Sequence, residues 1–124
     1  MKLNTLLIPT LIGVIAPAFC AVRIDLAIIR SNNISISDPI DLSVDGKTHK
    51  IYQDARTYIE VELLEEKTEV KMRFIVATTN ESNAFMVRGA PHLNISLEHG
   101  LGMTSLQCNG KDEMFNLLVA AVKV

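Results

Sequence analysis

Hydrophobic and polar residues alternate along much of this chain. The alternating segments cover residues 22–28, 40–44, 59–63, 70–76 and 93–97. A period of two places successive side chains on opposite faces of a strand, so each segment predicts a half-buried antiparallel strand. Turn-forming pairs such as Asp45-Gly46 and Asn109-Gly110 separate the segments. The pattern therefore predicts an all-β, mainly antiparallel fold, either a small β-sandwich or a partly open barrel.

Two further segments fit more than one element. Residues 62–67 are rich in helix formers, so a short helix competes there with a strand. Residues 115–124 are apolar on both faces, which is typical of a central strand, although periodicity alone also fits a buried helix.

The chain also carries a weak internal repeat of about fifty residues. Residues 22–64 and 70–124 both run in the order strand, proline, alternating strand, glycine, polar stretch and strand. This order predicts a duplicated β unit. The competing interpretation is that alternation and turns recur in any all-β chain.

The N-terminal segment has the composition of a secretory signal peptide. Lys2 precedes an apolar run over residues 5–16, and small residues follow at Ala16, Ala18 and Ala21. Residues 1–18 are therefore the predicted signal, with cleavage after Ala18 or after Cys20. The run is interrupted by prolines and falls short of the about 20 apolar residues that span a bilayer, so we expect no transmembrane span in the mature form. Residues 19–124 then form a single domain in the periplasm or outside the cell.

The two cysteines of the chain, Cys20 and Cys108, are the candidate disulfide. An exported protein with two cysteines commonly pairs them, and closing the loop between them would stabilise the fold by about 4 kcal/mol. Cleavage after Cys20 would instead leave Cys108 as a single thiol, typical of a small buried hydrophobe. A third interpretation is a lipid anchor on Cys20, although Phe19 is bulky where such signals have a small residue.

The charge balance limits the kind of partner. The chain has 12 basic and 14 acidic side chains, and removal of Lys2 with the signal leaves 11 − 14 = −3. Phosphate backbones need a basic surface, so nucleic acid is not expected to be a partner.

The element in which a proline precedes an alternating strand and a glycine, found over 39–46 and 91–100, resembles one in bacterial outer-membrane secretins and in small periplasmic β proteins. The chain departs from secretins in lacking the alanine after the glycine and the long membrane-barrel strands. The resemblance implies a periplasmic β domain near an envelope machine, and no functional residue is carried over from it.

No sequence motif predicts a catalytic residue or a cofactor. The chain has no Gly-x-Ser-x-Gly elbow, no HExxH motif and no phosphate-binding glycine loop. Carboxylates cluster between Glu60 and Glu69, and alternation places Glu60 and Glu62 on the predicted solvent face, where they act as ordinary surface charge. His99 and Met103 together offer an imidazole and a thioether, a weak candidate site for copper.

A polar segment over 78–83 leads into an apolar run that contains Phe85 and Met86. If these two side chains are exposed they form the candidate partner-contact patch, and otherwise they belong to a core strand. The sequence thus predicts a non-catalytic, exported protein-interaction module, such as an inhibitor, an immunity protein or an accessory protein of an envelope machine. The alternatives are a small hydrolase with an unrecognised site and a periplasmic copper carrier. The oligomeric state stays open.

Overall fold

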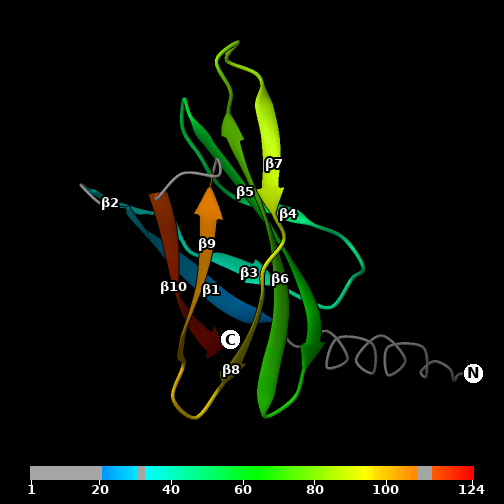
Figure 1. The fold of residues 1–124 in the computed structure, drawn as a ribbon. Helices are drawn as coiled ribbons and strands as arrows, with labels where there is room; N and C mark the ends of the chain where they lie inside the picture. The colour runs from blue at the N-terminus through cyan, green and yellow to red at the C-terminus, as the bar shows by residue number, and fades with distance from the viewer. Residues whose placement is uncertain (1–20, 31–32, 109–112) are drawn as a thin grey trace, which may run out of the picture.

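The computed structural model describes residues 21–30, 33–108 and 113–124, and these residues form strands and turns without a helix (Figure 1). The predicted all-β, antiparallel fold is confirmed. Within the described part of the chain no helix is long and apolar enough to cross a membrane. The strands are β1 (Val22–Arg30), β2 (Asn33–Ile36), β3 (Ile40–Leu42), β4 (His49–Gln53), β5 (Thr57–Glu66), β6 (Glu69–Thr79), β7 (Phe85–Gly89), β8 (His92–Ser96), β9 (Leu101–Cys108) and β10 (Glu113–Lys123).

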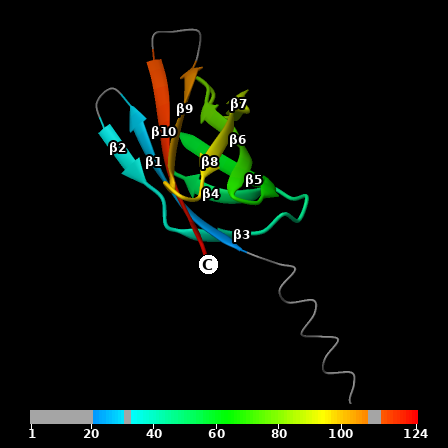
Figure 2. The ribbon, with the colours of Figure 1, turned by 90° about the horizontal axis from the view of Figure 1, so that it is seen from below.

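The strands form two sheets that pack face to face as a small β-sandwich (Figure 2). Sheet A has the order β2-β1-β10-β9, and β3 pairs with the other end of β1. Sheet B has the order β4-β5-β6-β7, and β8 pairs with the other end of β6. Every one of these strand pairs is antiparallel.

The core lies between the sheets and is built from alternate residues of the long strands. Four successive inward positions of β1 are fully buried. Inward residues of β10, beside β1 in sheet A, and of β5 and β6 in sheet B are buried as well. The two largest buried side chains are Phe74 in β6 and Phe115 in β10. The period of two in the sequence thus corresponds to one dry and one wet side of each sheet.

The two ambiguous segments are both strands. Glu62 to Glu66 completes β5, because pairing with β6 outweighs the local preference for helix. Ion pairs cross these strands as Arg73–Glu62 at 2.8 Å and Lys71–Glu65 at 3.4 Å. The C-terminal segment forms β10, a central strand hydrogen-bonded on both sides, by β1 and by β9.

The two halves of the chain have the same pattern of strand pairing. In the first half β1 pairs with β2 and β3, and β4 pairs with β5; in the second half β6 pairs with β7 and β8, and β9 pairs with β10. The pairs β5–β6 and β10–β1 then join the halves. Sheet A therefore corresponds strand for strand to sheet B, which is the arrangement that the predicted duplication would produce.

The halves are not separate domains. Sheet A contains three strands of the first half and two of the second, and sheet B contains the reverse. The polar stretch between the halves is the tight β5–β6 hairpin around Lys67 and Thr68. Each half completes the sheet of the other, and neither could bury its apolar side chains alone.

Candidate interaction surface

The outer face of sheet A carries an apolar row that crosses four strands. The register aligns Ile36 of β2, Ala27 of β1, Leu118 of β10 and Met103 of β9. Ile36 is 71% exposed and Met103 is 58% exposed. Solvent-facing sheet positions usually carry polar side chains, so a row of this length without a charge is unusual for a surface in contact with water alone.

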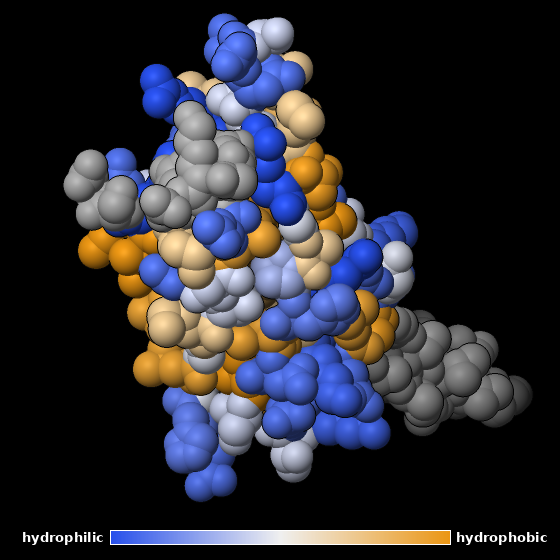
Figure 3. Space-filling view, in the orientation of Figure 1, coloured by the Kyte–Doolittle hydropathy of each residue, from blue (hydrophilic) through white to orange (hydrophobic). Residues whose placement is uncertain are grey.

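Further exposed apolar side chains surround this row. Figure 3 shows hydrophobic residues gathered on the left side of the molecule, where β2 and β10 lie. We use the term apolar face for the following outward residues of sheet A: Ala27, Ile34, Ile36, Leu101, Met103, Met114, Leu118 and Val122.

The corresponding row on sheet B is charged. When the halves are aligned on their first buried residues, Val22 and Val70, the row Met103–Leu118–Ala27 corresponds to Lys50–Glu60–Ile75. The same backbone positions thus hold a lysine and a glutamate on one sheet, and a methionine and a leucine on the other. Because the fold accepts charge at these positions, the apolar side chains of sheet A are not a requirement of the sandwich itself.

The apolar face ends at β2, whose outer edge pairs with no strand of the described residues. The N–H of Ser37 donates to the carbonyl of Leu26 over 2.8 Å, so Leu26 and Ser37 form a hydrogen-bonded pair next to the β1–β2 ladder. On an edge strand of an antiparallel sheet, every second residue directs its backbone N–H and C=O toward the neighbouring strand. Ser35 bonds to β1 in this way, so Ile34 and Ile36 direct their backbone groups away from β1. The two most exposed isoleucines therefore also present the unpaired backbone groups of this edge.

The edges of sheet B carry features that discourage strand addition. In β4 the ladder is interrupted between Lys50 and Tyr52, and Lys50 places a charge on the strand. The β6–β7 ladder is interrupted between Val76 and Ala77, and β7 contains Arg88. Bulges and charges are the usual protection of free edges, and β2 has neither.

Phe85 and Met86 are 43% and 45% exposed on β7, so this segment is an exposed strand and not a core strand. They are adjacent along the strand and face opposite sides of sheet B. The Phe85 ring lies 6.0 Å from the ring of Tyr58 on the outer face. Met86 lines a pocket at the end of the sandwich. The two side chains therefore do not form one patch, and their role as a partner contact remains a prediction.

The other candidates from the sequence have no site built around them within the described residues. Cys20 and the side chain of Cys108 lie outside the part that the structure describes. His99 is exposed in the turn between β8 and β9, and Met103 belongs to the apolar face. No group of three or more histidine, cysteine, aspartate or glutamate side chains gathers in the described parts of the chain.

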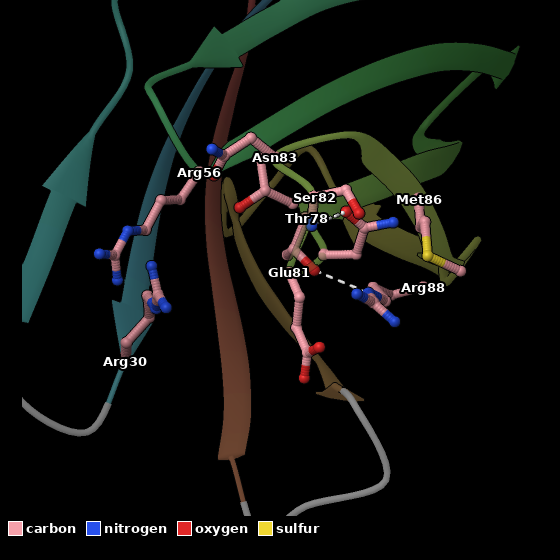
Figure 4. Close-up of a pocket in the computed structure, with 10 residues that line it drawn as sticks. Arg30, Arg56, Thr78, Glu81, Ser82, Asn83, Met86 and Arg88 are labelled. Atoms are coloured by element: carbon pink, nitrogen blue, oxygen red, sulfur yellow. Dashed lines mark hydrogen bonds between the residues drawn. The ribbon is translucent and has the colours of Figure 1, made fainter.

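The pocket has a volume of about 750 Å³ and opens at the end of the sandwich where β1 and β6 finish. Figure 4 shows its lining, in which Arg30 and Arg56 extend to one side and Arg88 lies on another, next to Thr78. Sequence patterns give no sign of this pocket, because its residues come from four separate segments. The sequence pattern that could indicate the β2 edge is short, because Ile34 and Ile36 alternate with polar residues over only four positions.

Comparison with known proteins finds no match to this chain among family models, curated proteins or solved structures.

Proposed function

We propose that this chain is a non-catalytic, exported protein-interaction module that binds an extended segment of a partner protein along the β2 edge. The predicted signal over residues 1–18 supports export, so the site of action is periplasmic or extracellular. The partner segment adds a strand beside β2 and rests its apolar side chains against the apolar face. Strand addition of this kind obtains affinity from backbone hydrogen bonds and specificity from alternate side chains.

One observation carries the proposal: Ile34 and Ile36 combine exposed apolar side chains with outward backbone groups on an unprotected edge. Ile34 is 63% exposed and Ile36 is 71% exposed. A bound strand would remove both side chains from water and pair the backbone groups at the same time. The row that starts at Ile36 continues across three more strands, which gives the partner a continuous apolar surface.

The chemistry of the edge defines the partner. Asn33, Ile34, Ser35 and Ile36 carry no charge, so no charged residue of the partner is needed opposite them. The preferred segment is extended, lacks proline at the pairing positions and alternates apolar with polar residues. A second copy of this chain, pairing β2 with β2, is the other occupant of the same edge that the test must distinguish.

Site-specific photocrosslinking in cells of the source organism tests the proposal. A photoreactive phenylalanine at Ile34 or Ile36 is expected to crosslink one partner protein, at a contiguous segment with alternating apolar residues. The same probe at Lys50, which lies on the outer face of sheet B, is the matched control and is expected to give no such product. A probe at Phe85 tests the predicted contact on β7 separately.

The substitution Ile34→Pro sharpens the result. It removes an N–H that points away from β1, so the β1–β2 ladder keeps its hydrogen bonds while the edge loses a donor. We expect the crosslink from Ile36 to disappear in this variant while the folded state persists. A product that is a dimer of this chain, a product of equal yield from Lys50, or a crosslink that survives Ile34→Pro would contradict the proposed partner site.

A further inference from the structure

Glu60 differs from the other carboxylates of β5. Glu62, Glu65 and Glu66 each form an ion pair with a basic side chain, over distances from 2.8 to 3.4 Å. Glu60 forms no ion pair with the described residues, although it is partly buried on the outer face of sheet B. Partly buried charges are usually paired, so the carboxylate of Glu60 stands out among its neighbours.

The residues beside Glu60 leave its charge to a group from outside the fold. Lys50 of β4 lies opposite Glu60 in the register, but its ammonium lies 3.4 Å from a side-chain amide oxygen of its own strand and makes no ion pair with Glu60. On the other side Glu60 lies opposite Ile75 of β6, which is apolar. Arg73, the next outward residue of β6, is already bound to Glu62 over 2.8 Å.

The Glu60 carboxylate is joined to an aromatic ring. It accepts a hydrogen bond from the hydroxyl of Tyr58 over 2.5 Å, and this bond raises the pKa of Tyr58 above its ordinary value. The Phe85 ring contacts the Tyr58 ring at a centroid distance of 6.0 Å and an angle of 56°. Opposite Tyr58 on β6 is Ala77, whose small side chain is buried. The hydrogen bond and the ring contact together hold the Tyr58 ring beside the carboxylate before any ligand binds.

A carboxylate next to an aromatic ring matches the chemistry of a guanidinium group. The planar guanidinium of arginine stacks on aromatic rings, and its N–H groups donate to carboxylate oxygens. We infer that Glu60 and Tyr58 bind an arginine side chain of a protein partner on the outer face of sheet B. Phe85 is a positioning residue, because it contacts the Tyr58 ring. This inference is independent of the β2 edge, since it concerns the other sheet and an arginine-containing segment instead of an alternating apolar one.

The surroundings of the pair favour a protein partner over a free small cation. Ile75 lies opposite Glu60, and the exposed Val87 belongs to the same row as Tyr58, so apolar surface is present for the aliphatic part of an arginine. Small-molecule sites enclose most of their ligand, whereas the outer face of a sheet is open. Arginine and tyrosine are the residues that most often dominate protein interfaces. The formal net charge of −2 also favours a basic partner at long range.

Photocrosslinking from Val87 in cells of the source organism tests the inference. A photoreactive phenylalanine at this position, which is 66% exposed, is expected to crosslink a partner segment that contains an arginine close to the crosslinked residue. Glu60→Gln is expected to lower the yield about fivefold, through loss of the ion pair. Glu69→Gln is the matched control, because Glu69 is exposed on the same sheet and forms no ion pair with the described residues. We expect this control to leave the yield unchanged.

Variants of Tyr58 separate the role of the ring from that of the hydroxyl. Tyr58→Phe keeps the ring and is expected to keep the crosslink, whereas Tyr58→Leu is expected to lower its yield about threefold. Amide spectra of the purified variants establish that each is folded. A synthetic peptide of the crosslinked segment, with neutral citrulline in place of arginine, is expected to bind the purified protein about fivefold more weakly than the arginine peptide.

Four results would overturn the inference. They are the absence of a product from Val87, a product without a nearby arginine, a yield that Glu60→Gln leaves unchanged, and a loss in Glu69→Gln equal to that in Glu60→Gln.

Discussion

Gly46 and Gly100 occupy corresponding positions in the two halves, with φ angles of 74° and 75°. Gly46 lies between β3 and β4, and Gly100 lies between β8 and β9, where the chain crosses from one sheet to the other. Both glycines take the left-handed conformation that other residues adopt only at a cost. This correspondence agrees with the common pairing pattern of the halves.

The two glycines should differ in their tolerance of alanine. A Cβ at Gly46 would meet no atom within 4 Å, whereas a Cβ at Gly100 would lie 3.0 Å from the carbonyl oxygen of Ala121. Gly46→Ala is expected to lower the free energy of unfolding by about 1–2 kcal/mol, the cost of the backbone conformation alone. Gly100→Ala is expected to cost more. Urea denaturation of both variants measures the difference, and equal losses would contradict the close contact.

The two phenylalanines of sheet B test the assignment of β7 as an exposed strand. Phe74 is fully buried, so Phe74→Ala is expected to cost about 3–5 kcal/mol of unfolding free energy. Phe85 is 43% exposed, so Phe85→Ala is expected to cost about 1 kcal/mol or less, including its contact with Tyr58. A loss at Phe85 that approaches the loss at Phe74 would show a core strand instead.

The carboxyl group of Asp54 is expected to make the free energy of unfolding depend on pH in the acid range. Partial burial alone would raise the pKa of this carboxyl, but hydrogen bonds from the Tyr52 hydroxyl and from the N–H groups of Arg56 and Thr57 hold the pKa below its usual range. A lowered folded-state pKa stabilises the protein above the unfolded value of about 3.9, and this contribution is lost as pH falls through the folded value.

Asp54→Asn is therefore expected to lower the melting temperature at neutral pH and to have a smaller effect at about pH 3, where the carboxyl of the unfolded chain is protonated. Thermal unfolding of both proteins across this range provides the measurement. A variant whose deficit is as large in acid as at neutral pH would indicate that the carboxylate charge is not the cause.

Leu118→Glu tests whether the apolar face is needed for folding. The substitution copies Glu60, the residue at the corresponding position of sheet B. We expect the free energy of unfolding to change by no more than about 0.5 kcal/mol, because Leu118 is already partly exposed. The crosslink from Ile36 is expected to weaken. A large loss of stability would mean that the face serves the fold and not a partner.

The fold class could be predicted from the sequence because apolar and polar residues alternate where a strand has one buried and one solvent-facing side, as at Val22 to Ile28. Sheet order could not, since it depends on which strands meet after the chain crosses at Gly46 and Gly100. The helix-forming composition of residues 62–67 was overridden by pairing with β6.

The pocket and the β2 edge could be predicted from the sequence less well than the strands could. The pocket arginines are separated by tens of residues, and only the folded arrangement brings them to one opening. The apolar pair Phe85 and Met86 suggests one contact patch in the sequence, but adjacent residues of a strand face opposite sides of the sheet. The importance of Ile34 and Ile36 comes from the free edge, which a short alternating segment does not reveal.

Amide hydrogen exchange of the complex with the crosslinked partner segment, supplied as a synthetic peptide, tests the central claim most directly. Ser35 bonds inward to β1, so its amide is expected to be protected with and without the peptide. The amides of Ile34 and Ile36 are expected to exchange rapidly in the free protein and to become protected when the peptide binds. Binding that leaves the Ile34 and Ile36 amides in fast exchange would contradict strand addition at this edge.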